Sequence, residues 1–329
     1  MKLKRNSNEF YKYTREDCLV NKQKLVVLTG PTAVGKTKLS IELAKKINGE
    51  IISADSVQVY KGMDIGSAKV KEDEMSGVKH YLIDCLEPTS EFNVNVFQSL
   101  AKEAMEKIYN KGKIPIIVGG TGFYIQALIY DIDFTKEEQD ITYRQDLEDI
   151  ARREGVEFVH DLLKEVDPIS AQNIHANNLK RVIRALEFYH QNGSKISEHN
   201  EEQGKKKSPY DTYYFVIEDD RDVLYDRINK RVDEMFGAGL VEEVKTLIKK
   251  GCTTELVSMQ AIGYRQVVDY IDGKCNLEDA IDKVKKDTRH FAKRQLTWFR
   301  REKEVVWLNR QVLKNDEEIL KTILGMLNR

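Results

Sequence analysis

One octapeptide near the N-terminus has the residue types and spacing of a phosphate-binding loop. It reads GPTAVGKT and consists of Gly30, Pro31, Thr32, Ala33, Val34, Gly35, Lys36 and Thr37. In the pattern G-x-x-x-x-G-K-[ST], glycines let backbone N–H groups point at phosphate oxygens, the lysine adds a positive charge, and the Ser or Thr hydroxyl can bind Mg²⁺. The sequence therefore predicts a phosphate cradle with Thr37 as a metal ligand. Kinases, NTPases and other enzymes share such loops, so the motif alone leaves the reaction open.

The segments around the loop indicate which elements position it. Short apolar runs alternate with helical patterns, which is typical of a parallel sheet covered on both faces. The expected strands are 25–29, 50–55, 81–86, 114–120, 212–217 and 305–308. The expected helices of the first half include 36–47 and 94–109. This pattern predicts an α/β fold with a P-loop NTPase-like parallel sheet flanked by helices.

The strand pattern is interrupted in the middle of the chain. Between 131 and 204 the sequence offers helical patterns and no convincing strand. The expected helices there are 141–154, 157–165 and 179–190. We therefore predict an inserted all-helical subdomain. The expected divisions are an N-terminal extension (1–23), an α/β core (24–130), a helical insertion (131–208) and a return to the core with basic C-terminal helices (209–329).

Composition restricts the class of protein without identifying it. The chain has 329 residues and a net charge of −1, so any nucleic-acid-binding surface must come from uneven placement of charge. The first 23 residues lack the apolar run of a secretory signal, and no stretch approaches a membrane span. The four cysteines are far apart, which argues against a zinc site and a disulfide framework. A cytoplasmic, monomeric protein is expected.

Polar residues follow the strands next to the predicted loop. Asp55 ends the second strand, and Thr121 follows the fourth within Gly-Gly-Thr-Gly. Ligands of open α/β sheets bind at the carboxyl ends of the strands, so these residues are candidates for the site. From its position alone, Asp55 could bind Mg²⁺, accept a proton or cap the following helix.

Six strings in order identify a family resemblance that covers nearly the whole chain after about residue 24. They are GPTAVGKT (30–37), SADSVQVYKGMDIGSAK (53–69), GGTGFY (119–124), NNLKRVIRALE (177–187), MQAIGYRQ (259–266) and AKRQLTWFR (292–300). The combination resembles the bacterial tRNA dimethylallyltransferase family. That resemblance implies transfer of a dimethylallyl group from dimethylallyl diphosphate to the exocyclic amine of the adenosine 3′-adjacent to the tRNA anticodon, with Mg²⁺ as cofactor and the anticodon stem-loop as partner.

The resemblance also implies roles for individual residues. Asp55 matches the family's general base, Thr121 a residue that contacts tRNA at the reacting centre, and Arg231 an arginine that holds the diphosphate. Arg227 lies one helical turn from Arg231 and is an alternative. The tRNA-binding positions carried over are Asp55, Ser56, Val57, Gln58, Arg144, Lys180, Arg181, Val182, Ile183 and Arg184.

Two basic segments are expected to face RNA. In 179–190, Leu179, Val182, Ile183 and Leu186 form an apolar stripe, and the basic residues of this helix fall off that stripe. Residues 281–303 contain nine basic and three acidic residues, with Lys286, Arg289, Lys293 and Arg300 at helical spacing. A nearly neutral chain can thereby present a cationic surface.

Three other functions are compatible with a P-loop. A small-molecule kinase would not need the basic C-terminal segment. An isopentenyltransferase that acts on free adenine nucleotides would not need the helical insertion. An RNA-binding P-loop ATPase would not need the strings around Asp55 and Thr121, because these strings match the pattern of a transferase site.

Overall fold

The computed structural model describes residues 22–134 and 141–328, and these residues form two compact units. Of the described residues, one unit takes 22–129 and 208–328, and the other takes those between Tyr130 and Lys207. The expected insertion, 131–208, differs from the second unit by one residue at each end. The expected N-terminal extension, 1–23, lies outside the described residues except for Lys22 and Gln23.

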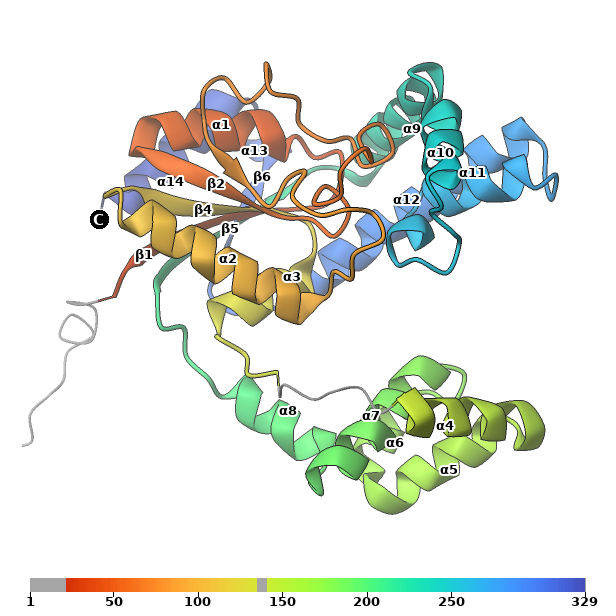
Figure 1. The fold of residues 1–329 in the computed structure, drawn as a ribbon. Helices are drawn as coiled ribbons and strands as arrows, with labels where there is room; N and C mark the ends of the chain where they lie inside the picture. Colours follow the sequence, from red (N-terminus) through yellow and green to blue (C-terminus); the bar gives the residue numbers. More distant parts are fainter. Residues whose placement is uncertain (1–21, 135–140, 329) are drawn as a thin grey trace, which may run out of the picture. The chain divides into compact units, whose positions relative to one another are not determined.

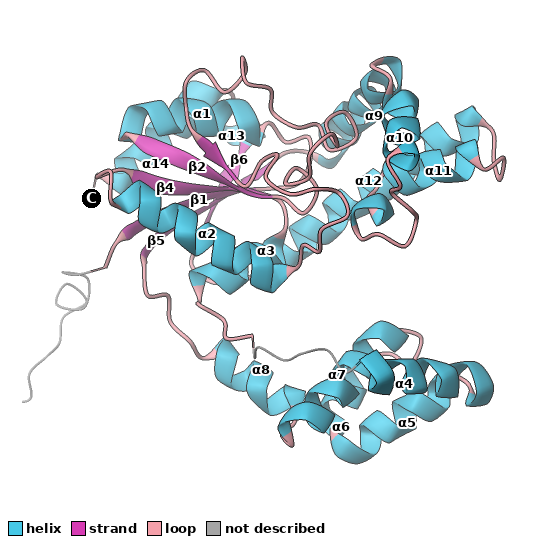
Figure 2. Cartoon of the chain, viewed as in Figure 1, coloured by secondary structure: helices cyan, strands magenta, loops and turns pink. Residues whose placement is uncertain are grey.

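A parallel sheet forms the centre of the first unit (Figures 1 and 2). The described strands are β1 (Lys24–Thr29), β2 (Gly49–Ala54), β3 (His80–Tyr81), β4 (Ile114–Gly119), β5 (Asp211–Glu218) and β6 (Val305–Asn309). Their order is β3-β2-β4-β1-β5-β6, and each neighbouring pair is parallel. The inner strands are almost fully buried, as expected when helices cover both faces. The predicted fold class is confirmed.

Helices cover both faces of this sheet (Figure 1). On one face, α1 (Lys36–Ile47) packs against α14 (Asp316–Leu327). On the other face, α2 (Val94–Tyr109) packs against α3 (Gly122–Ile129). Because every strand runs in the same direction, the loops that follow β1, β2 and β4 meet at one edge of the sheet.

The C-terminal helices of this unit gather beyond that edge (Figure 1). They are α9 (Arg221–Gly237), α10 (Leu240–Lys249), the 3₁₀ turn η1 (Ser258–Gln260), α11 (Tyr264–Ile271) and α12 (Leu277–Phe299). The chain then enters β6, and the short helix α13 (Arg310–Leu313) follows. Helix α12 packs against α9, α11 and α3, so it connects the C-terminal helices to the sheet.

The second unit contains helices and no strand among its described residues, and it has an apolar core of its own. It comprises α4 (Ile141–Glu154), α5 (Val156–Val166), α6 (Pro168–Asn173), α7 (Leu179–Asn192) and α8 (Ile196–Gly204). Val159 and Leu163 of α5 pack with Val182, Ile183 and Leu186 of α7 in this core. A buried carboxylate, that of Asp167, accepts hydrogen bonds from the Ser170 and Ser197 hydroxyls at 2.7 and 2.8 Å.

One predicted strand is wrong in extent. The expected strand 81–86 is a two-residue strand, β3, and the chain leaves the sheet after Tyr81. Leu82 and Asp84 have φ angles of 61° and 51°, which are incompatible with extended backbone. Among the described residues, none of the helices is long and apolar enough to cross a membrane.

Candidate active site

The phosphate loop connects β1 to α1 with the backbone shape that its motif predicts. Ala33 and Gly35 have φ angles of 63° and 91°, in the left-handed region. Gly35 adopts this conformation without strain, and the guanidinium of Arg310 lies against its Cα. Within the loop, Lys36 Nζ donates hydrogen bonds to the carbonyls of Gly30 and Pro31 at 2.9 and 2.8 Å. The Lys36 ammonium group thus lies against the loop whose backbone N–H groups would bind a phosphate.

Three charged side chains converge beside the loop. Burial and the nearby positive charge of Arg231 lower the pKa of Lys36 to about 7, although the negative charge of Asp55 acts in the opposite direction. Burial likewise lowers the pKa of Arg231, again against the effect of Asp55. The two cations are therefore held close enough to repel one another, with one carboxylate beside them. An anion such as a diphosphate would relieve this repulsion.

The structure distinguishes the two arginines of α9. Arg227 pairs with the buried carboxylate of Asp219 at 2.7 Å, and so its guanidinium is already engaged. Arg231 instead interacts with Lys36 and Asp55 and lies 3.5 Å from the Ala68 carbonyl. Of the two arginines, Arg231 is therefore the one whose charge acts on Lys36 of the phosphate loop.

Asp55 shapes the turn that follows β2. Its Oδ1 accepts hydrogen bonds from the backbone N–H groups of Val57 and Gln58 at 2.8 and 3.2 Å. This Asx turn uses one carboxylate oxygen and leaves the other available to a substrate. Ser56, at the tip of the turn, is exposed, and Val57 is half-buried. The Gln58 amide is directed back to the carbonyls of Ser67 and Ala68, both at 3.3 Å.

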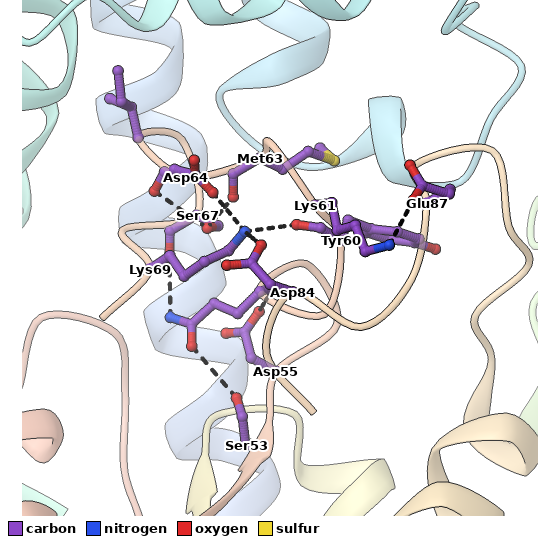
Figure 3. Close-up of polar contacts among 12 residues, drawn as sticks. Ser53, Asp55, Tyr60, Lys61, Met63, Asp64, Ser67, Lys69, Asp84 and Glu87 are labelled. Carbon is purple, nitrogen blue, oxygen red and sulfur yellow. Dashed lines mark hydrogen bonds and ion pairs between the residues drawn. The ribbon is translucent and has the colours of Figure 1, made fainter. Parts of the chain in front are cut away.

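A buried ammonium group braces the segment after this turn. Figure 3 shows Lys69 directed at Asp64, Asp84 and the backbone of Tyr60. Its Nζ donates to the Tyr60 carbonyl and to Asp64 Oδ1, both at 2.6 Å, and pairs with Asp84. These contacts close residues 60–69 into a loop. Residues 82–84 turn away from the sheet, and this turn brings the Asp84 carboxylate to Lys69.

A second carboxylate attaches the same loop to the C-terminal helices. Glu243 of α10 accepts hydrogen bonds from the backbone N–H groups of Asp64, Ile65 and Gly66 at 2.9, 2.7 and 3.2 Å. It also accepts one from the Tyr264 hydroxyl at 2.8 Å. The loop after Asp55 is therefore fixed by residues some 180 positions away in the chain.

Thr121 lies at the neighbouring strand end, as its position predicted. Its N–H donates to the Ala54 carbonyl at 3.3 Å, so Thr121 adjoins Asp55 across β2 and β4. Its carbonyl accepts the N–H groups of Tyr124 and Ile125 and thereby starts α3. Burial, with the charges of Tyr60 and Asp55, raises the pKa of Tyr124 to about 12.

Two residues that support the site were missed from the sequence. Arg310 Nε donates to the Val34 carbonyl at 2.8 Å, and its Nη1 pairs with Asp316. Neither Arg310 nor Glu243 belongs to a motif with a known role, and both act over long separations in sequence.

Arg231 also lines a cavity of about 1040 Å³ between the loop 64–84 and α9. Lys69, Lys71, Lys79 and His80 contribute cationic or titratable groups to its wall, and Val70, Met75, Ile83 and Met235 contribute apolar side chains. Four carboxylates, those of Asp64, Glu72, Asp84 and Glu234, also line it, so the charged groups of the cavity are mixed in sign and do not by themselves select an anion.

In the helical unit, α7 presents its basic residues to solvent. Lys180, Arg181 and Arg184 are exposed, as the apolar stripe predicted. Val182 and Ile183, however, are 0% and 3% exposed in the core of the unit. The expectation that these two residues contact tRNA is wrong for their side chains, because the stripe that orients the cations outward places both of them inward.

Arg144 of α4 has a partner within the same unit. Its guanidinium forms a two-pronged pair with Glu187 of α7, at 2.7 Å for both Nε and Nη2. The Glu187 side chain is only 2% exposed, so the pair compensates a buried charge. Arg144 therefore stabilises the packing of α4 on α7, and a contact with RNA would have to use its remaining N–H groups.

The basic residues of the long helix α12 and of the two positions after it form two groups, one paired and one exposed. Lys283 and Lys285 pair with Asp287 and Asp233, and Arg289 donates to Asn229 at 2.5 Å. Lys286, Lys293, Arg294, Arg300 and Arg301 are exposed. The predicted cationic face is thus smaller than its helical spacing suggested, because Arg289 packs toward α9.

The donor groups at the loop fit a Mg²⁺ ion that is carried mainly by a diphosphate. Thr37 is exposed at the first turn of α1, where its hydroxyl belongs to the phosphate loop motif. No group of three or more His, Cys, Asp or Glu side chains suited to a metal occurs in residues 22–134 and 141–328. Mg²⁺ commonly takes only one or two protein ligands and completes its shell with water and phosphate oxygens. A single hydroxyl ligand is consistent with this mode.

Comparisons with known proteins agree on one family. The family model described as "IPP transferase" matches residues 58–302. The chain is 56% identical over 305 residues to a tRNA dimethylallyltransferase of Lachnoclostridium phytofermentans, which covers 93% of this chain and 97% of that protein. A tRNA delta(2)-isopentenylpyrophosphate transferase structure from Staphylococcus epidermidis is 45% identical, with a TM-score of 0.69 over 93% of this chain and 99% of that chain. A eukaryotic dimethylallyltransferase structure, described as acting on tRNA, is 33% identical, with a TM-score of 0.76 over 87% of this chain and 74% of that chain.

Proposed function

Because this chain belongs to the IPP transferase family, we propose that it is a tRNA dimethylallyltransferase. The enzyme transfers a dimethylallyl group from dimethylallyl diphosphate to the exocyclic amine of the adenosine 3′-adjacent to the anticodon, giving isopentenyladenosine. The observation that supports this most strongly is the convergence of Lys36, Arg231 and Asp55 beside the phosphate loop. The two cations suit the stabilisation of a departing diphosphate, and the carboxylate suits the removal of a proton from the amine.

The phosphate loop holds the leaving group. The carbon–oxygen bond between the dimethylallyl group and the diphosphate breaks, and negative charge develops on the diphosphate. Backbone N–H groups of the loop, the dipole of α1, Lys36 and Arg231 stabilise that charge. Mg²⁺ bound through Thr37 would supply further charge neutralisation on the diphosphate.

Asp55 is the general base. The exocyclic nitrogen forms a bond to the dimethylallyl carbon and must lose one proton, which the Asp55 carboxylate accepts. The Asx turn supports this assignment, because it fixes the carboxylate through Oδ1 and leaves its second oxygen for the substrate amine. Thr121 adjoins Asp55 at the end of the adjacent strand, which supports a role for its hydroxyl in orienting the acceptor base.

The tRNA partner is bound by two sets of exposed cations. One set is Lys180, Arg181 and Arg184 on α7, and the other is Lys293 and Arg294 on α12 with Arg300 directly after it. The target base must leave its stack to reach Asp55, which costs a few kcal/mol that contacts in the pocket offset. The turn at Ser56, Val57 and Gln58 is positioned to contact the extruded base because it follows Asp55 directly.

The test is a reconstitution with purified protein, Mg²⁺, dimethylallyl diphosphate and unmodified tRNA, without ATP. Mass analysis of the tRNA should show one dimethylallyl group in place of a hydrogen on the adenosine next to the anticodon. A parallel reaction with AMP as acceptor should give no product. Phosphoryl transfer that requires ATP, with no prenylated tRNA, would reject the proposal, and efficient prenylation of AMP would replace tRNA as the acceptor.

A further inference from the structure

Gln295 of α12 is a buried polar side chain that touches two separate parts of the site. Its Oε1 accepts a hydrogen bond from the Thr32 N–H at 2.9 Å, and its Nε2 donates one to the Gly120 carbonyl at 2.9 Å. The residue is 6% exposed and shares the buried face of α12 with Ala292 and Phe299. Only a group with both an acceptor and a donor can make this bridge.

Gly120 lies directly against the Gln295 amide. A Cβ atom on Gly120 would overlap Gln295 Nε2, so the glycine at 120 provides the space that the amide occupies. Gly120 is itself buried, and loss of Gln295 would leave its carbonyl without that donor. The second glycine of the Gly-Gly-Thr-Gly turn is therefore accounted for by a contact with α12.

The two bridged segments have different tasks. Thr32 belongs to the loop that holds the leaving diphosphate, and Gly120 precedes Thr121 at the acceptor side. The loop has its own supports, since Lys36 binds the Gly30 and Pro31 carbonyls and Arg310 binds the Val34 carbonyl. Thr29, directly before the loop, donates from its hydroxyl to the Gly119 carbonyl at 2.7 Å, and Gln295 adds a bridge from within the loop to the turn 119–121.

We propose that Gln295 is a positioning residue that sets the distance between the diphosphate and the acceptor base. This inference rests on the proposed function. Because the loop keeps its other supports, removal of the bridge should impair the alignment of the two substrates more than the binding of either one. The effect should therefore fall on kcat and not on the KM of dimethylallyl diphosphate.

The first test replaces the amide by an apolar side chain of similar length. Gln295→Met should lower kcat by roughly 10- to 100-fold, since small misplacements in an active site have effects of that size. The KM for dimethylallyl diphosphate and the Kd for inorganic pyrophosphate should change by less than about threefold. Unchanged kcat, or a weakened Kd that accounts for the whole loss, would overturn the proposal.

The matched control is Gln266→Met. Gln266 is also a buried glutamine with one accepted and one donated hydrogen bond, to the Gly263 N–H at 2.9 Å and to Asp287 at 2.8 Å. It does not contact the phosphate loop or the turn 119–121. Both variants should lose thermal stability, whereas kcat measured well below Tm should fall only in Gln295→Met. Equal losses of kcat would assign Gln295 a purely structural role.

A second variant tests the hydrogen-bonding pattern directly. In Gln295→Glu, the ionised carboxylate accepts from Thr32 but faces the Gly120 carbonyl without a donor, whereas the protonated acid again has one donor and one acceptor. Burial favours the protonated form. The kcat of this variant relative to the unsubstituted enzyme should rise about tenfold as the pH falls from about 8 to about 5.5. A ratio that does not depend on pH would contradict the bridge.

The same experiments separate this proposal from the proposed function. If the unsubstituted enzyme forms no prenylated tRNA, the proposed function fails and no comparison of kcat arises. If it forms product and Gln295→Met forms it at the same rate, only the role of Gln295 is rejected.

Discussion

Among the single residues, Asp55 combines two roles that substitution can separate. Its Oδ1 builds the turn, and the carboxylate is the proposed base. Asp55→Asn keeps an oxygen that can accept from Val57 and Gln58 but cannot take a proton. We expect kcat to fall by roughly 10²- to 10⁴-fold with tRNA affinity intact. Asp55→Ala should lose the turn as well, and so bind tRNA less tightly than Asp55→Asn. If Asp55→Asn retained its turnover, Asp55 would be a binding residue.

The two arginines of α9 form a natural matched pair. Arg231 lies beside Lys36, whereas Arg227 is paired with Asp219. Arg231→Lys keeps a charge but removes the planar guanidinium, and it should weaken the binding of inorganic pyrophosphate, measured by calorimetry, by at least about tenfold. Arg227→Lys should change that affinity little. The reverse order of effects would transfer the diphosphate contact to Arg227.

Lys36 makes the stability of the unliganded protein depend on pH. Its pKa is about 7 in the folded chain against 10.5 for an ordinary lysine. Between these values the unfolded chain carries the additional proton, so this residue makes the free energy of unfolding rise with pH. Below about pH 7 the full cost of burying the charge remains.

Lys36→Met removes this dependence. The Tm of Lys36→Met minus the Tm of the unsubstituted protein should be highest near about pH 6. This difference should fall toward about pH 9, because the unsubstituted protein gains stability over that range. Lys38→Met, an exposed position on the same helix, should show no such trend. Melting curves at four or more pH values test this, and a Tm difference that is the same at every pH would contradict it.

Among the elements, α12 combines a buried face that supports the site with an exposed face that carries charge. Lys293→Gln with Arg294→Gln should weaken tRNA binding and reduce the slope of log K against log[salt] by about one to two. Lys283→Gln on the same helix should have little effect, because Lys283 already pairs with Asp287. Filter binding at several salt concentrations measures both slopes. An unchanged slope in the double variant would exclude this face from the RNA interface.

The elements also show what the sequence could and could not predict. Apolar runs located the strands at the centre of the sheet, and parallel order then placed Asp55 and Thr121 at one edge. The extent of β3 could not be predicted, because Leu82 and Asp84 leave the extended region so that Asp84 can pair with Lys69. Gln295 could be noticed in the sequence as a polar residue on the apolar face of α12. Its partners could not be predicted, because Thr32 lies 263 positions away in the chain and the contact depends on tertiary packing.

At the scale of the whole molecule, the helical unit has the properties of an independent folding unit. Tyr130–Lys207 contains its own apolar core, and the buried charges of Asp167 and Glu187 are satisfied inside it. We expect the excised segment to show a helical circular dichroism spectrum and a cooperative melt. A protein in which a flexible Gly-Ser linker replaces this segment should still bind inorganic pyrophosphate but should not prenylate tRNA. Loss of pyrophosphate binding would show that the first unit depends on the second.

The supports of the phosphate loop also determine when during synthesis the site can form. The loop is synthesised well before its supports, because 263 residues separate Thr32 from Gln295 and 276 separate Val34 from Arg310. At about 5–20 residues per second, this delay is roughly 15–50 s. During the first part of this delay, until Asp211–Glu218 has been synthesised, β1 also lacks its neighbour β5. A chain that stops before Gln295 therefore has the complete phosphate-binding motif without these supports, and we expect activity to begin only after Arg310 has been synthesised.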